Sequence, residues 1–191
     1  RLFNETGTKA GLPENSVQLI ESTDRELVKE MITLDKYIDV LIPRGGKGLK
    51  KFIIENATIP VIETGAGVCH VFVDETAKVE MALPIVENAK TQRPSTCNSI
   101  ETVLVHRNIA EKILPVLTEM LIKDKVELRY SKEALERVGN RNDVKLAEEE
   151  DFGAEYLDMI MSLKLVDSVD EAIDYINSHS TQHSDSIITE N

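Results

Sequence analysis

The sequence of 191 residues contains only two cysteines, Cys69 and Cys97, and no tryptophan. Neither thiol lies in a C-x-x-C pair or at a spacing typical of metal ligands, so we expect no disulfide framework and no metal site. Long apolar runs are also missing, since no stretch approaches the roughly 18 residues of a membrane span, and no signal peptide opens the chain. These absences predict a globular, cytoplasmic protein that does not cross a membrane.

Basic residues are scarce relative to acidic ones. The 22 lysines and arginines face 34 aspartates and glutamates, which gives a net charge of −12. A surface for nucleic acid or for an anionic membrane is therefore not expected. A local basic site for a phosphorylated ligand stays compatible with this balance, because net charge does not describe one pocket.

The pattern along the chain alternates strands with helices, which predicts an α/β fold with a mainly parallel sheet. Two segments carry capping-box spacings that start helices, at residues 23–26 and 168–171. Polar and acidic residues fill 139–155, for which we predict an exposed loop. The expected strands are 17–20, 38–42, 70–73, 102–105, 126–128, 160–166 and 186–188, and the main expected helices are 49–55 and 109–122.

The glycine-rich break Gly65-Ala66-Gly67 is interpreted as a domain boundary, which divides the chain into residues 1–66 and 67–191. The first residue is not Met, and the last residues follow directly on an apolar strand. We therefore expect the chain to be an internal part of a longer protein.

A strand-to-helix turn with the sequence Pro43-Arg44-Gly45-Gly46-Lys47-Gly48 is the first candidate for ligand binding. Glycines let a backbone approach a phosphate, and the free N–H groups of a following helix favour an anion. The spacing matches neither the P-loop nor the dinucleotide-binding pattern. An ordinary tight turn therefore remains the alternative interpretation.

Cys97 is the stronger candidate for chemistry. A lone cysteine is more often a small buried apolar residue than a nucleophile. Cys97, however, lies in a polar turn between a helix and a strand, with Lys90 and Arg93 close by in the sequence. Nearby cations favour the thiolate, which is the nucleophilic form. Cys69 starts an apolar strand and is expected to be structural.

The other polar residues give weaker signals. His179 and His183 are four residues apart but lie on either side of a predicted helix end, so a metal face is not expected. The acidic residues at 148–151 fit a solvated loop.

Several stretches resemble the γ-glutamyl phosphate reductase family, also called glutamate-5-semialdehyde dehydrogenases, of the aldehyde dehydrogenase superfamily. The most specific stretch is Asn88-Ala89-Lys90-Thr91-Gln92-Arg93-Pro94-Ser95-Thr96-Cys97-Asn98, and the resemblance covers practically the whole chain. The shorter matches are Ile42-Pro43-Arg44-Gly45-Gly46, Gly67-Val68-Cys69-His70 and Thr181-Gln182-His183-Ser184-Asp185.

The resemblance implies an aldehyde-dehydrogenase-like α/β fold. Residues 1–66 would be the C-terminal part of a Rossmann-like NADP-binding domain, and residues 67–191 the catalytic, thiol-bearing domain. The implied reaction belongs to proline biosynthesis: NADPH reduces L-glutamyl 5-phosphate to L-glutamate 5-semialdehyde and phosphate is released. Cys97 would be the catalytic nucleophile and would form a thioester.

Further site residues follow from the resemblance. Gly45 and Gly46 match the turn near the cofactor diphosphate, and Glu155 falls near a glutamate that contacts the nicotinamide ribose. Arg93 and Asn98 flank the nucleophile, and we interpret them as substrate contacts. Glu63 lies near the general-base glutamate of hydrolytic relatives, but its spacing to the glycines differs, so it receives no such role.

The resemblance places the oxyanion-stabilising asparagine before Arg1, so the 191 residues alone are expected to be inactive or nearly so. It also admits a homo-oligomer and an association with glutamate 5-kinase. Two alternatives stay open: a hydrolytic aldehyde dehydrogenase that uses the same thiol, and a non-catalytic binding or assembly module in which Cys97 is structural.

Overall fold

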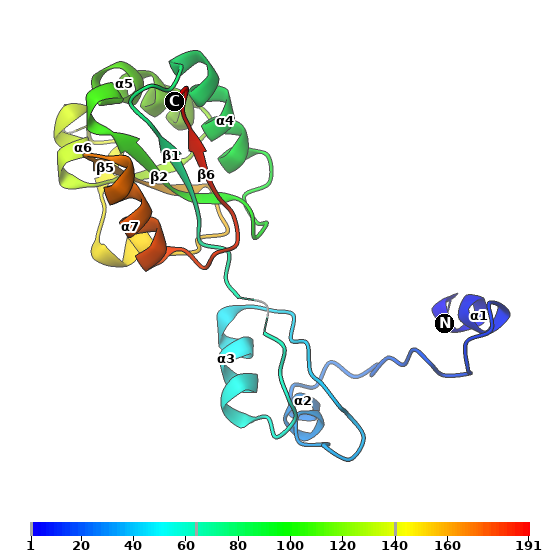
Figure 1. Ribbon diagram of the computed structural model, residues 1–191. Helices are drawn as coiled ribbons and strands as arrows, with labels where there is room; N and C mark the ends of the chain where they lie inside the picture. The colour runs from blue at the N-terminus through cyan, green and yellow to red at the C-terminus, as the bar shows by residue number, and fades with distance from the viewer. Residues whose placement is uncertain (1, 64, 140) are drawn as a thin grey trace. The chain divides into compact units, whose positions relative to one another are not determined.

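The computed structural model describes residues 2–63, 65–139 and 141–191 (Figure 1). Its contacts divide the chain into two compact units, residues 1–64 and residues 65–191. We call them the N-terminal unit and the C-terminal unit. Among the described residues, no helix has the length and apolar character needed to cross a membrane.

The N-terminal unit contains three helices: α1 (Leu2–Lys9), α2 (Glu26–Met31) and α3 (Lys47–Asn56). Helix α1 ends at Lys9, and Gly11 follows it with a φ of 93°, the left-handed conformation that favours glycine just after a helix. A small apolar core holds α2 and α3 together and consists of Ile32, Leu41, Ile53 and Ile59.

The strands predicted at 17–20 and 38–42 are not formed as such. Residues 17–20 are irregular, and residues 38–42 contribute only one parallel bridge, between Leu41 and Val61. A strand exists by pairing its N–H and C=O groups with a neighbour. Within the described residues, 17–20 has no neighbouring strand, so its apolar pattern predicted the wrong structure.

The C-terminal unit is built on one six-stranded sheet with the order β4-β3-β5-β2-β1-β6. Every pairing between neighbouring strands is parallel, which confirms the predicted α/β class. The strands are β1 (Cys69–Val73), β2 (Ile100–His106), β3 (Glu127–Tyr130), β4 (Val144–Leu146), β5 (Ile160–Val166) and β6 (Asp185–Ile188).

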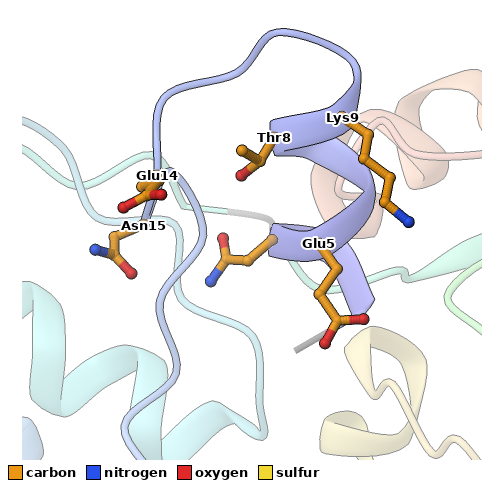
Figure 2. A pocket seen from close by; sticks show the side chains of 6 residues that line it. Glu5, Thr8, Lys9, Glu14 and Asn15 are labelled. Carbon is orange, nitrogen blue, oxygen red and sulfur yellow. The ribbon is translucent and has the colours of Figure 1, made fainter.

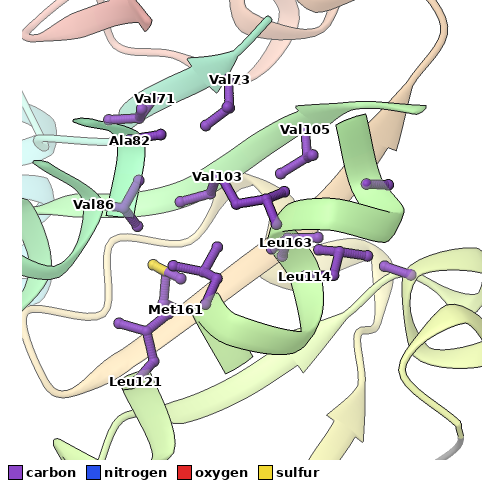
Figure 3. Close-up of a cluster of buried hydrophobic side chains, with 14 of the residues drawn as sticks. Val71, Val73, Ala82, Val86, Val103, Val105, Leu114, Leu121, Met161 and Leu163 are labelled. Carbon is purple, nitrogen blue, oxygen red and sulfur yellow. The ribbon is translucent and has the colours of Figure 1, made fainter. Parts of the chain in front are cut away.

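Side chains alternate between the two faces of this sheet. On one face, residues such as Val71, Val103 and Met161 pack against helices α4 (Val79–Thr91), α5 (Arg107–Lys123) and α6 (Lys132–Arg137). Figure 3 shows this main core, in which side chains of β1, β2 and β5 meet those of α4 and α5. On the other face, Phe72 and Leu104 pack against α7 (Val169–His179) and the short 3-10 helix η1 (Glu149–Gly153).

Helix α7 begins as predicted, because the Ser168 side chain accepts a hydrogen bond of 3.1 Å from the Glu171 N–H. The acidic stretch 139–155 is more ordered than the exposed loop predicted for it, since it contains β4 and η1. Asp151 and Phe152 in η1 are buried. Burial of an acid is stable here because the Arg129 guanidinium pairs with the Asp151 carboxylate at 2.5 Å.

Candidate active site

The loops that precede four neighbouring strands meet at the amino-terminal edge of the sheet in the C-terminal unit. They are residues 65–68 before β1, 92–99 before β2, 154–159 before β5 and 180–184 before β6. Hydrogen bonds join the first loop to the third and the fourth. Open parallel sheets usually bind ligands at the carboxyl edge, so the position of this cluster departs from the general rule.

The loop of residues 92–99 carries Cys97 between the end of α4 and the start of β2. Two short turns shape it: Thr96 donates from its N–H and its hydroxyl to the Arg93 carbonyl, at 3.1 and 2.7 Å, and the Ser99 N–H donates to the Thr96 carbonyl at 3.0 Å. Cys97 is a free, exposed thiol. Arg93 and Asn98 are also exposed in the same loop, so the structure brings together the three residues predicted to handle the substrate.

The backbone of Gly67 packs against this loop at Cys97. A Cβ atom on Gly67 would lie 1.8 Å from the Cys97 carbonyl oxygen, a distance that no side chain tolerates. Only glycine lets the two backbones approach this closely. The glycine that was predicted to mark a domain boundary therefore also sets the position of the candidate nucleophile.

Glu155 reaches the same place from a distant part of the sequence. Its Oε1 accepts the Gly67 N–H at 2.5 Å. The hydrogen bond brings Glu155 next to the backbone that supports Cys97, although the residues are far apart in sequence. The contact by itself is structural, and the cofactor role of Glu155 stays a prediction.

Cys69 differs from Cys97 in its exposure to solvent. It is buried, and its Sγ lies 3.2 Å from the Cys97 carbonyl oxygen, to which it donates. Burial, assisted by the negative charge of Asp185, raises the pKa of Cys69 to about 11. At neutral pH this thiol is protonated, and a protonated thiol is a poor nucleophile.

A buried histidine was not singled out by the sequence. The His70 Nδ1 lies 2.9 Å from Asp185 Oδ1, and the His70 N–H donates to the same oxygen at 3.1 Å. Burial lowers the pKa of His70, against the opposing effect of Asp185. The sequence feature that could have indicated this pair is that residues 67–70 and 181–185, which contain His70 and Asp185, both resemble the same family.

The sequence predicted Lys90 to be a free cation near the Cys97 thiol, and this prediction is wrong. Its Nζ lies 2.7 Å from Glu101 Oε2, and both side chains are fully buried. Burial lowers the pKa of Lys90 and raises that of Glu101, while each partner's charge opposes that change. The charge of Lys90 is therefore balanced inside the unit, and Arg93 is the exposed cation of the loop.

Gly45 and Gly46 lie in the N-terminal unit. Gly46 is the N-cap of α3 and has no side chain to cap it, and a Cβ atom there would meet nothing within 4 Å. A Cβ atom on Gly45 would meet only the flexible Leu49 side chain. The start of α3 thus offers N–H groups to an anion, and this fits a cofactor diphosphate.

A hollow of about 540 Å³ lies between α1 and the chain that follows it (Figure 2). It is lined by Asn4, Glu5, Thr8, Lys9, Glu14 and Asn15. It contains no thiol and none of the predicted site residues, so it is not the candidate active site. Within 2–63, 65–139 and 141–191, no group of three or more His, Cys, Asp or Glu residues could hold a metal ion.

Known proteins resemble this chain in both sequence and fold. The family model described as "Aldehyde dehydrogenase family" matches residues 2–134. The γ-glutamyl phosphate reductase of Francisella philomiragia is 54% identical over 189 residues, which cover 99% of this chain and 45% of the relative. That of Campylobacter curvus is 51% identical over 215 residues, which cover 98% of this chain and 48% of the relative.

A solved structure agrees with these matches. The crystal structure of the γ-glutamyl phosphate reductase from Thermotoga maritima superposes with a TM-score of 0.88 at 52% identity, covering 98% of this chain and 45% of that one. The chain therefore spans about half the length of the curated relatives it matches. Since the family model matches well over half of its residues, the chain belongs to the aldehyde dehydrogenase family.

Proposed function

We propose that this chain carries the thiol site of a γ-glutamyl phosphate reductase, which reduces L-glutamyl 5-phosphate to L-glutamate 5-semialdehyde and phosphate in proline biosynthesis. The observation that carries the proposal is the exposed Cys97 thiol in a loop fixed by Gly67, with Cys69 buried beneath it. About half the residues are identical to those of proteins named γ-glutamyl phosphate reductase, along nearly the whole chain.

In the proposed reaction, the Cys97 thiolate attacks the acyl carbon of glutamyl phosphate. The C–O bond to phosphate breaks, phosphate leaves with the electron pair, and a thioester forms on Cys97. Arg93 and Asn98, exposed in the same loop, supply a cation and an amide for the substrate. The Cys97 loop keeps its shape through the turn hydrogen bonds to Arg93 and Thr96, which hold the nucleophile without closing it off from solvent.

The cofactor we propose is NADP(H), which when bound supplies the hydride that converts the thioester into the aldehyde. Gly45 and Gly46 would hold its diphosphate at the start of α3, and Glu155 would hold its ribose. The open N-cap at Gly46 supports the first assignment. Two free thiols and no disulfide among the described residues fit a reducing compartment, so we propose a cytoplasmic enzyme.

The test is an assay of the full-length protein in the reverse direction, with glutamate semialdehyde, phosphate and NADP⁺. We expect NADPH formation that depends on phosphate. In Cys97→Ala we expect the rate of NADPH formation to fall by at least about a thousandfold. The double substitution Thr118→Val/Tyr130→Phe, which removes both partners of one buried hydrogen bond in the core, serves as a control that keeps activity. Retained activity in Cys97→Ala would remove Cys97 from the mechanism.

The same assay distinguishes the alternatives. NADPH formation that does not need phosphate would indicate a hydrolytic aldehyde dehydrogenase. No activity with this substrate, together with slow alkylation of Cys97, would favour a binding or assembly module. A homo-oligomer and an association with glutamate 5-kinase stay predictions, which size-exclusion chromatography with and without the kinase would test.

A further inference from the structure

One buried ion pair has no role in the reaction proposed above. Lys90 lies in the last turn of α4 and Glu101 is the second residue of β2, so the two residues bracket the loop that carries Cys97. Their charged atoms are 2.7 Å apart, and neither side chain has any exposed surface. Burying two charges costs several kcal/mol per ion before pairing. An apolar pair of similar size is often equally stable, so stability alone does not account for an ion pair here.

The hydrogen bonds of the pair lead to the loops of the candidate active site. Lys90 Nζ donates to the Ile100 carbonyl at 3.0 Å, at the point where the Cys97 loop joins β2. Glu101 Oε1 accepts the Leu157 N–H at 3.2 Å, which attaches the pair to the loop before β5. The pair therefore connects both ends of the Cys97 loop to a second loop of the site.

That second loop leads back to Cys97. Glu155 lies two residues before Leu157, and its carboxylate accepts the Gly67 N–H at 2.5 Å. Gly67 in turn lies against the Cys97 carbonyl. These contacts run from Lys90 through Glu101, Leu157, Glu155 and Gly67 to Cys97. The backbone between Lys90 and Cys97 closes them into a ring.

The backbone of Leu157 is strained within this ring. Its φ of 54° places a residue with a branched side chain in the left-handed region. Such a conformation costs on the order of 1 kcal/mol or more and persists only where the surrounding structure imposes it. The bond from the Leu157 N–H to Glu101 is one of the contacts that impose it here.

We propose that the Lys90–Glu101 ion pair is a positioning device that fixes the Cys97 loop relative to the Glu155 loop. The two residues do not touch substrate in this role; they hold the segments that do. The proposal rests on the proposed function for its effect on turnover. Its effect on the reactivity of the Cys97 thiol is independent of that function.

The test uses the full-length protein with the double substitution Lys90→Met/Glu101→Leu, which replaces both charges with apolar groups of similar size. We expect the melting temperature to stay close to that of the parent. We expect kcat to fall by about tenfold or more, because displacement of the nucleophile by about 1 Å costs up to 100-fold. We also expect the rate of Cys97 alkylation by iodoacetamide to change by at least about threefold at fixed pH.

A matched control is Thr118→Val/Tyr130→Phe, which removes a buried hydrogen bond of 2.9 Å in the core of the same unit. It should leave both kcat and the alkylation rate unchanged. A folded Lys90→Met/Glu101→Leu variant with parental kcat and a parental alkylation rate would overturn the proposal. If the parent shows no turnover, the proposed function fails, but the alkylation rates still decide whether the pair positions Cys97.

If Lys90→Met/Glu101→Leu does not fold, the variant Lys90→Met/Glu101→Gln tests the proposal in its place. The glutamine keeps an acceptor for the Leu157 N–H, while the bond from Lys90 to the Ile100 carbonyl is lost. We expect a smaller decrease in kcat, of about threefold, and a corresponding change in Cys97 alkylation. Parental values of both in this variant would overturn the proposal.

Discussion

The backbone of Gly67 lies directly against the carbonyl group of Cys97, with no room for even one additional carbon atom between them. Gly67 is buried, and its N–H is held by Glu155. Neither backbone segment can move away without breaking a contact that the candidate active site depends on. The position of the thiol-bearing loop is therefore set by backbone packing as much as by its own sequence.

Gly67→Ala is expected to displace the Cys97 loop, because the added Cβ atom would lie 1.8 Å from the Cys97 carbonyl oxygen. We expect kcat/KM in the reverse assay to fall by roughly 100-fold, as for a displacement of the nucleophile by about 1 Å. Gly65→Ala is the matched control, since its Cβ atom would meet nothing within 4 Å. Equal activity of the two variants would contradict the packing argument.

Gly46→Asp is expected to change stability and cofactor affinity in opposite directions. Aspartate is a good N-cap, and Gly46 has a φ of −69° that any residue adopts, so α3 should gain a few tenths of a kcal/mol. The carboxylate would repel a diphosphate at the same helix start, so KM for NADP⁺ should rise by about tenfold or more. Steady-state kinetics and thermal unfolding measure the two effects.

Gly46→Asn is the neutral control for that prediction. It can cap α3 in the same way but carries no charge, so its KM should rise much less than that of Gly46→Asp. An unchanged KM for NADP⁺ in Gly46→Asp would contradict the assignment of the cofactor diphosphate to this turn.

The stability of the C-terminal unit is expected to fall as the pH drops below about 6.5, the ordinary pKa of His70. Burial lowers the pKa of His70 in the folded protein, so below that pH the unfolded chain binds more protons than the folded one. The free energy of unfolding therefore rises with pH from the lowered pKa of folded His70 up to about 6.5. Above that pH the contribution of His70 to stability is complete. Urea unfolding at a series of pH values measures the slope.

His70→Gln should reduce that slope, because the group that titrates differently in the two states is gone. His183→Gln is the control, since His183 is exposed. An unchanged slope in His70→Gln would assign the pH dependence to other groups.

Much of the C-terminal unit follows from local patterns in the sequence. The strand at 160–166 appears with the predicted bounds, and Ser168 caps the next helix through the predicted spacing to Glu171. These features depend on residues close together in the chain, and the sheet supplies every strand with a partner. Residues 17–20 lack such a partner among the described residues, so an apolar pattern was not sufficient there.

The candidate active site was predictable only in part. The exposed position of Cys97 follows from the polar residues on both sides of it. The ion pair of Lys90 with Glu101 and the hydrogen bond from Gly67 to Glu155 join residues that are 11 and 88 positions apart in the sequence. No spacing rule encodes such contacts, since they depend on which loops the parallel sheet brings to its amino-terminal edge.

Alkylation by iodoacetamide tests the central claim, that Cys97 is the nucleophile, most directly. The full-length protein is labelled for increasing times near neutral pH, and each sample is assayed in the reverse direction and digested for peptide mass spectrometry. We predict that Cys97 is labelled first, that activity falls in step with its labelling, and that Cys69 stays unmodified because burial raises its pKa to about 11. Full activity with Cys97 completely alkylated would contradict the account.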